Sequence, residues 1–190
     1  MNNHSLYVGL MSGTSIDAVD AVAVSFDHGN LKLAGHHSQP IKEDLRQAIL
    51  QLCNPQTDSL QLLAETDYRL GKLYAKTSLA LLNKLGLQSS VITAIGCHGQ
   101  TIRHSAPLKG AIPYSLQIGD ANIVAAETGI PVVADFRRKD MALGGQGAPL
   151  VPAFHRQIFA SAKKSRVIVN IGGIANITSL PKDNSCTGFD

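Results

Sequence analysis

The sequence of 190 residues predicts an α/β fold built around a mixed β-sheet. Three observations predict it. Segment 6–24 has alternating apolar positions on both sides of a Gly/Ser/Thr turn, which indicates a β-hairpin. Segment 58–85 repeats leucine at helical spacing. Segment 91–97 is short and nearly continuously apolar, which is typical of a buried parallel strand.

Composition limits the class of protein. Hydrophobic residues make up 44% and charged residues 16%, which favours a packed core and argues against disorder. The net charge of +3 suits anionic ligands but is far from the dense basic stripe of a nucleic-acid binder. The sequence shows neither a signal peptide nor an apolar stretch as long as a membrane span. Three cysteines without metal or redox spacing indicate a reducing, cytoplasmic compartment.

The turn of the first hairpin carries the chemistry-bearing residues. Small residues that expose main-chain N–H groups lie there beside two hydroxyls and the carboxylates of Asp17 and Asp20. Such a tip can hold phosphate oxygens while an aspartate orients a hydrated Mg²⁺. An ordinary hairpin with a polar tip is the alternative. A third antiparallel strand is expected over 31–35, after a turn at 28–30.

Two helices are expected next, packed on the sheet and without active-site residues. The first lies between Pro40 and Asn54. The second begins at Asp58, with Gln61 three residues later as in a capping box, and ends at Gly86, which suits a left-handed position.

Polar residues follow two of the expected strands. His98, Gln100, Thr101 and Arg103 come after strand 91–97, where the ligand crevice of an open α/β sheet lies, and can hydrogen-bond a sugar. A lone histidine there would more often be structural. Asp120 is expected to cap a helix that ends near Gly129.

A further strand over 131–134 leads to an Arg-Arg-Lys run at 137–139. Such a run is usually a solvated surface, but an arginine after a buried strand can bind a carboxylate or phosphate in a bidentate manner. A rigid Gly/Pro-rich loop follows over 144–152, and segment 166–178 repeats the pattern of strand, Gly-rich turn and strand.

Four stretches resemble one protein family. Met-Ser-Gly-Thr-Ser-Ile-Asp-Ala-Val-Asp at 11–20 resembles the phosphate motif of the anhydro-N-acetylmuramic acid kinases, of the sugar kinase, Hsp70 and actin superfamily. The His-Gly-Gln-Thr segment at 98–101, the Gln-Ile-Gly-Asp turn at 117–120, and Asp-Phe-Arg-Arg at 135–138 with the loop 144–152 agree with it. Ala18 departs from the family, which usually has glycine there.

The resemblance implies an actin-like ATPase (ribonuclease H-like) fold. Its first domain, residues 1–130, would hold a mixed five-stranded sheet with flanking helices on both faces. Residues 131–190 would be the truncated start of a second, similar domain. The chain therefore resembles the N-terminal half of such an enzyme, and we expect it to be inactive alone.

The function implied is a kinase that uses ATP and Mg²⁺. It converts 1,6-anhydro-N-acetylmuramic acid, with opening of the anhydro bridge by water, to N-acetylmuramate 6-phosphate and ADP. This reaction belongs to peptidoglycan recycling in the bacterial cytoplasm. The partners implied are the amino sugar and ATP, without nucleic acid or membrane, and a homodimer stays open. Another sugar or acid kinase of the superfamily and a non-catalytic ATP-binding module are the alternatives.

The resemblance also implies roles for single residues. Asp190 would be the catalytic base, by its Gly-Phe-Asp context. The cofactor-binding residues would be Gly13, Thr14, Ser15, Ile16, Asp17, Ala18, Val19 and Asp20. The substrate-binding residues would be His98, Gln100, Thr101, Arg103, Arg137 and Gln146. Asp17 and Asp20 would hold the metal through water.

Overall fold

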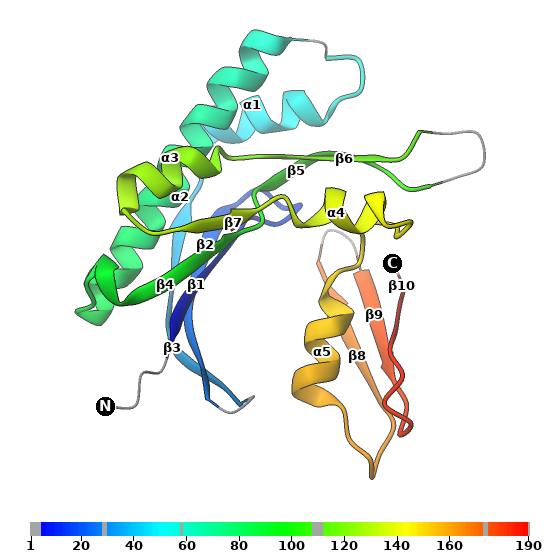
Figure 1. Cartoon of the computed structure of the whole chain (residues 1–190). Helices are drawn as coiled ribbons and strands as arrows, with labels where there is room; N and C mark the ends of the chain where they lie inside the picture. Colours follow the sequence, from blue (N-terminus) through cyan, green and yellow to red (C-terminus); the bar gives the residue numbers. More distant parts are fainter. Residues whose placement is uncertain (1–4, 28–29, 58, 108–111, 173–174, 190) are drawn as a thin grey trace. The chain divides into compact units, whose positions relative to one another are not determined.

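The computed structural model describes residues 5–27, 30–57, 59–107, 112–172 and 175–189 (Figure 1). The chain divides into two compact units. Unit 1 comprises residues 1–105 and 114–135, and unit 2 comprises residues 106–113 and 136–190. The domain boundary expected between residues 130 and 131 stays a prediction.

Unit 1 is built on a five-stranded sheet in the order β3-β2-β1-β4-β7. Its strands are β1 (Leu6–Met11), β2 (Ala18–Asp27), β3 (Asn30–Pro40), β4 (Ile92–Cys97) and β7 (Val132–Ala134). The first three strands form an antiparallel meander, whereas β4 runs parallel to β1 and β7 parallel to β4. This sheet confirms the predicted α/β fold with a mixed five-stranded sheet and flanking helices of the actin-like type.

The helices of unit 1 are α1 (Glu43–Cys53), α2 (Leu60–Leu85), the 3₁₀ turn η1 (Ser89–Val91) and α3 (Ala121–Thr128). The predicted capping box of α2 is wrong. Ser59 is the N-cap, since its side chain accepts from Leu62 N–H, and the Gln61 side chain donates to Glu65 instead. Asp58 itself lies outside the described residues.

The ends of α2 and α3 confirm three further predictions. Gly86 ends α2 with a φ of 65°, and Gly129 ends α3 with a φ of 68°, both left-handed. At the start of α3, Asp120 caps the helix by accepting from Asn122 N–H at 2.8 Å. These positions were predictable because capping depends on local sequence.

The core lies on one face of the five-stranded sheet. The cross-strand row Ala23, Val8, Ile95 contributes fully buried side chains to it. The next row, on the opposite face, contains Gly9 and Gly96 between the exposed Val22 and Val133. Helices on both faces were expected, and this was wrong. The crossovers from β3 to β4 and from β4 to β7 advance toward the same edge, so right-handed connections place their helices on the same face.

The polar segment after β4 forms a hairpin that the sequence did not indicate. Strands β5 (Gln100–Ser105) and β6 (Tyr114–Ile118) pair antiparallel as a separate two-stranded sheet. Contacts with α1 and α2 hold this hairpin within unit 1. Of the predicted sugar-binding segment, His98 lies just before the hairpin, and Gln100, Thr101 and Arg103 lie on β5.

Unit 2 contains a three-stranded antiparallel sheet in the order β10-β9-β8. Its elements are α4 (Phe136–Ala142), α5 (Val151–Phe159), β8 (Arg166–Ile171), β9 (Ala175–Leu180) and β10 (Thr187–Phe189). The β8–β9 hairpin confirms the predicted second strand-turn-strand unit. Helix α5 packs on β9, where His155 Nδ1 lies 2.9 Å from Thr178 Oγ1. Across the described ranges, no helix combines the length and apolarity that crossing a membrane requires.

Candidate active site

The turn between β1 and β2 is fixed from inside by Ile16. Its N–H donates to Gly13 O at 3.2 Å, and its side chain is buried in the core. Its backbone is left-handed, with a φ of 52°. Thr14 and Ser15 are exposed at the tip. On the far side of the turn, Asp17 O accepts from Ile41 N–H at 2.9 Å. A turn held at both ends with its hydroxyls exposed is suited to presenting donors to a phosphate.

Asp17 is an exposed carboxylate whose pKa is lowered by its neighbour Ser15. Ser15 Oγ donates to Asp17 Oδ1 at 2.6 Å, and chiefly for this reason the pKa of Asp17 lies below its ordinary value. The positive charge of Arg46 lowers this pKa further. Asp20, on β2, is also exposed. Two carboxylates therefore stand at the turn, and Asp17 is charged at neutral pH.

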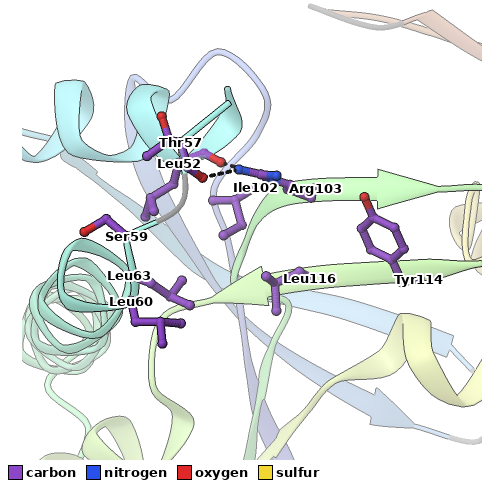
Figure 2. A pocket seen from close by; sticks show the side chains of 9 residues that line it. All are labelled: Leu52, Thr57, Ser59, Leu60, Leu63, Ile102, Arg103, Tyr114 and Leu116. Carbon is purple, nitrogen blue, oxygen red and sulfur yellow. Dashed lines mark hydrogen bonds between the residues drawn. The ribbon is translucent and has the colours of Figure 1, made fainter. Parts of the chain in front are cut away.

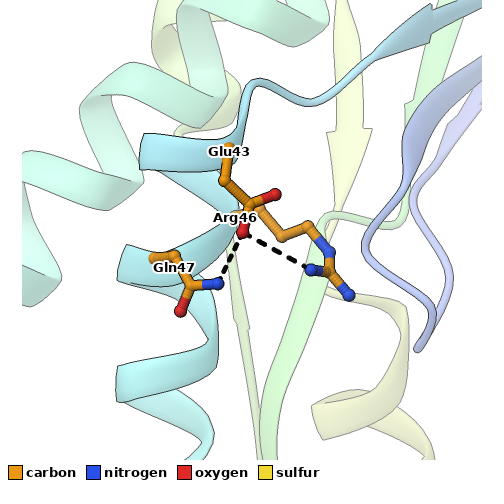
Figure 3. Close-up of polar contacts among 3 residues, drawn as sticks. All are labelled: Glu43, Arg46 and Gln47. Carbon is orange, nitrogen blue, oxygen red and sulfur yellow. Dashed lines mark hydrogen bonds and ion pairs between the residues drawn. The ribbon is translucent and has the colours of Figure 1, made fainter.

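Arg46 lies on the first turns of α1 and is oriented by its own helix. Its guanidinium lies 3.6 Å from Glu43 Oε1, which also accepts from Gln47 Nε2 at 2.5 Å (Figure 3). An exposed pair of this kind contributes little to stability. Its relevance is electrostatic, since it places a cation near Asp17.

The other predicted cofactor residues differ in what they can offer. Val19 is fully buried in the core and Ile16 nearly so, which leaves only their main-chain groups available to a ligand. Ala18 is partly buried at the start of β2. Gly13, Thr14 and Ser15 thus remain the predicted residues with accessible donors.

Ser12 is a buried residue of this turn that the sequence analysis missed. Its Oγ lies 2.6 Å from Tyr74 Oη and donates to Gln100 Oε1 at 2.7 Å. These partners lie 62 and 88 positions away along the chain, so no local motif could have indicated them. The turn is therefore anchored to α2 and to β5.

The predicted sugar-binding residues of unit 1 are largely engaged within the protein. His98 Nδ1 lies 2.7 Å from Gly99 O, and Thr101 Oγ1 accepts from Gln117 Nε2 at 3.0 Å. Gln100 is buried, and its amide bonds Ser12 and the Thr101 carbonyl. His98 and Thr101 are half-buried, so they are the more accessible of these residues.

Arg103 holds the chain just after α1. Its guanidinium donates to Asn54 O and Thr57 O, both at 2.7 Å, and more weakly to Leu52 O and Pro55 O. These carbonyls lie in the last turn of α1 and just after it, where main-chain acceptors lack helical partners. Binding of a sugar by Arg103, as predicted, would require these bonds to break.

Arg103 also borders a pocket of about 290 Å³ between the hairpin and the two long helices (Figure 2). The lining is mostly aliphatic, with leucines from α1 and α2 facing Ile102 and Leu116 of the hairpin. Thr57, Ser59, Arg103 and Tyr114 add polar groups to this lining. Of these, Ser59 and Arg103 already bond main-chain groups of the protein.

In unit 2, Arg137 and Asp140 of α4 hold the Gly-rich loop. Arg137 Nη1 donates to Gly147 O at 2.6 Å, and Asp140 Oδ2 accepts from Gly147 N–H at 2.8 Å. A Cβ at Gly145 would collide with the Asp140 carboxylate, which explains glycine there. Gln146 is exposed at the tip. Asp190, the predicted base, lies outside the described residues.

The two acidic residues of the turn, Asp17 and Asp20, suit an Mg²⁺ ion whose remaining ligands are phosphate oxygens and water. The described segments contain no cluster of three or more His, Cys, Asp or Glu side chains that could hold a metal ion. Mg²⁺ in nucleotide sites usually takes one or two carboxylates, with phosphate oxygens and water as the remaining ligands. Asp17 and Asp20 match that smaller requirement.

Comparison with known proteins identifies the family. The family model described as anhydro-N-acetylmuramic acid kinase matches residues 5–190. A protein of that name from Photobacterium profundum is 54% identical over 184 residues, 97% of this chain and 48% of its own. Another, from Shewanella amazonensis, is 54% identical over 189 residues, 99% of this chain and 51% of its own. The chain therefore spans about half the length of the curated relatives it matches.

One solved structure supports the fold alone. A reductive activator for a corrinoid, iron-sulfur protein aligns with a TM-score of 0.50 and 16% identity, covering 99% of this chain and 31% of its own. The family match covers nearly the whole sequence, including the turn between β1 and β2 and the loop after α4. The chain belongs to the anhydro-N-acetylmuramic acid kinase family.

Proposed function

We propose that the intact protein phosphorylates 1,6-anhydro-N-acetylmuramic acid with ATP, giving N-acetylmuramate 6-phosphate and ADP. The observation that carries this proposal is the family match over residues 5–190. The geometry of the turn between β1 and β2 supports it, because exposed donors and an ionised carboxylate lie together there.

The phosphate site would be the turn itself. Gly13, Thr14 and Ser15 would supply N–H and O–H donors to the phosphates of ATP. Phosphoryl transfer depends mainly on positioning and on neutralising charge. Asp17 and Asp20 would hold Mg²⁺ through water, and the ion, when bound, neutralises phosphate charge. Asp17 is ionised at neutral pH, and Ser15 lowers its pKa further, so the carboxylate needs no proton release when the metal binds.

The sugar would be bound by His98, Thr101, Arg137 and Gln146. The planar guanidinium of Arg137 suits the sugar's carboxylate, since it can donate two parallel hydrogen bonds. Asp190 would accept a proton from the attacking water, as a general base does. As the water oxygen bonds to the anomeric carbon, the bond from that carbon to O6 breaks. O6 then takes the γ-phosphoryl group, and ADP leaves.

The same proposal includes the setting. Free thiols at Cys53, Cys97 and Cys186 fit a reducing compartment such as the bacterial cytoplasm. Peptidoglycan recycling would supply the substrate there. A homodimer remains part of the proposal.

A coupled ADP-release assay on the full-length protein, with and without the anhydro sugar, tests this function. We expect ADP release that depends on this sugar and is much weaker with a panel of other sugars. Preferential turnover of another sugar would instead favour a different kinase of the superfamily. ATP binding without turnover of any sugar would favour a non-catalytic module.

The Asp17→Asn variant tests the turn within the same assay. We expect lower turnover, most pronounced at limiting Mg²⁺, with the fold retained because the side chain is exposed. Asp183→Asn is the matched control, because Asp183 is also exposed and a serine hydroxyl, that of Ser185, likewise lowers its pKa. Equal rates for both variants at limiting Mg²⁺ would contradict the assignment of Asp17.

A further inference from the structure

A buried chain of hydrogen bonds starts at Tyr74 of α2. Its Oη lies 2.6 Å from Ser12 Oγ, and Ser12 Oγ donates to Gln100 Oε1 at 2.7 Å. A hydroxyl carries one hydrogen, so Ser12 must accept from Tyr74. Gln100 Nε2 in turn donates to Thr101 O at 3.2 Å. The bonds therefore run in one direction, from α2 through the first turn to β5.

The two middle members of this chain of bonds, Ser12 and Gln100, adjoin the two proposed ligand sites. Ser12 directly precedes Gly13, the first residue of the proposed phosphate turn. Gln100 directly precedes Thr101, a proposed sugar contact. Tyr74 touches neither of these accessible residues through its hydroxyl, and its side chain is fully buried. Its hydroxyl is linked to both sites through Ser12 and Gln100.

The ring of Tyr74 is fixed by the turn before α3. A Cβ at Gly119 would collide with Tyr74 Cε2, so the ring lies directly against that glycine. Gly119 has a φ of 112°, which other residues rarely adopt, and its N–H donates to Asp67 Oδ1 at 2.6 Å. With the ring held on this side, the hydroxyl has little freedom to move away from Ser12.

Three polar side chains in a core are costly unless each is satisfied. Tyr74, Ser12 and Gln100 are each at most 2% exposed, and each has a partner in this chain of bonds. Apolar residues would fill the same space without that cost. Fully satisfied buried networks fix one arrangement of the elements they join.

We propose that Tyr74 is a positioning residue: by donating to Ser12 Oγ, its hydroxyl keeps the Ser12 hydrogen directed at Gln100 and so supports the bond that couples the phosphate turn to the sugar-binding strand. The inference rests on the proposed function of both segments. Binding of ATP at the turn fixes Ser12, which fixes Gln100 and the start of β5 for the sugar. Such coupling is reciprocal, so the sugar strengthens ATP binding by the same factor.

Tyr74→Phe is the first test, because it removes the hydroxyl and keeps the ring against Gly119. In the full-length protein we expect kcat/KM for the sugar to fall on the order of tenfold to a hundredfold, as misplacement of binding groups does. We also expect the ratio of ATP Kd values measured without and with the sugar to fall toward one. Tyr68→Phe is the matched control, since it removes a hydroxyl from the same helix at a side chain that is 54% exposed.

A second readout does not depend on activity. Amide hydrogen exchange should become faster in Tyr74→Phe both at residues 13–16 and at 100–102, and remain unchanged there in Tyr68→Phe. If Tyr74→Phe does not fold, Ser12→Ala breaks the same chain of bonds while leaving the Tyr74 ring in place. Its exchange should then rise at 100–102, on the other side of the break.

The outcomes separate the inference from the proposed function. Faster exchange at both segments in a protein that does not phosphorylate the sugar would support the coupling and reject the function. Wild-type activity on the sugar, with unchanged exchange and an unchanged ratio of ATP Kd values in Tyr74→Phe, would overturn the inference. Faster exchange at one segment alone would also overturn it, because the hydroxyl would then serve only local packing.

Discussion

The five-stranded sheet of unit 1 and the three-stranded sheet of unit 2 contain similar apolar strands but bury them very differently. Ile95 on β4 of unit 1 is fully buried, whereas Ile171 on β8 of unit 2 is 81% exposed. Both belong to strands rich in isoleucine, valine or alanine, and sequence alone does not separate them. The difference lies in the layer above each strand: α2 and α3 pack on the five-stranded sheet, whereas α5 packs on β9.

The exposed face in unit 2 is continuous. Val169, Ile177 and Phe189 occupy paired positions across the three strands and are 41–57% exposed. On the opposite face, Thr178 and Leu180 are fully buried. A contiguous apolar face of this kind marks an interaction surface or an aggregation liability. The comparison teaches that, in this chain, helices decide which apolar strands become core.

The largest expected effect is a loss of activity without a loss of stability, caused by one substitution in unit 2. Asp190→Asn in the full-length protein should lower sugar-dependent ADP release about 10²–10⁴-fold, the usual contribution of a general base. The melting temperature should change little, because packing is not removed. Asp183→Asn, a substitution of the same kind in the same unit, should retain activity. If Asp190→Asn lowers the rate but the rate depends on pH as in the wild type, another residue is the base.

The next prediction tests the comparison of the two isoleucines directly. Ile95→Ala should lower the free energy of unfolding by about 2–5 kcal/mol, because it leaves a cavity in a packed core. Ile171→Ala should change it by less than about 0.5 kcal/mol, as exposed substitutions do. Chemical denaturation followed by circular dichroism measures both. Similar losses for the two variants would mean that the face of β8 is covered in solution.

Local and periodic features of this fold were predictable from the sequence. The β1–β2 hairpin, the parallel strand β4, the strand β7, and the caps at Gly86, Asp120 and Gly129 depend on neighbouring residues and were predicted correctly. The β5–β6 hairpin was missed, because its strands have polar residues such as Gln100 and Arg103 and obtain their stability from α1 and α2.

The candidate site was predictable only where residues lie close in sequence. Ser15 and Asp17, two positions apart, were both expected at the phosphate turn, and the structure joins them by a hydrogen bond. Tyr74 and Ser12 had no such signal, since their contact forms only when α2 packs on the sheet. Arg103 was expected to face a sugar because it follows a strand, but the carbonyls beyond α1 are nearer partners. Tertiary contacts therefore decide which polar residues remain available.

A smaller effect is expected from the exposed face of unit 2. Val169→Lys should reduce self-association of the 190-residue chain, because a charge within the apolar row makes burial of the row costly. Sedimentation velocity over a range of concentrations measures this. Lys163→Glu, a charge change at an exposed residue outside the sheet, is the control. Association that is unaffected by Val169→Lys would place the contact on another surface.

The smallest expected effect concerns the turn of unit 1, where the Ser15 hydroxyl lowers the pKa of Asp17. The pKa of Asp17 in the folded protein is lowered chiefly by Ser15 Oγ, whereas in the unfolded chain it returns to about 3.9. A lowered folded pKa means that ionised Asp17 stabilises the fold fully above the unfolded pKa, and that this contribution is lost as the pH falls through the folded pKa. Ser15→Ala should therefore raise the pKa of Asp17 toward its ordinary value and shrink that contribution, which is present in full at neutral pH and absent below the folded pKa. Titration of the carboxyl carbon by NMR measures the shift. Thr14→Ala removes an adjacent hydroxyl that is not among the groups acting on Asp17, so it should leave the titration unchanged. Equal titration midpoints in wild type and Ser15→Ala would show that the main chain, and not the serine, lowers the pKa of Asp17.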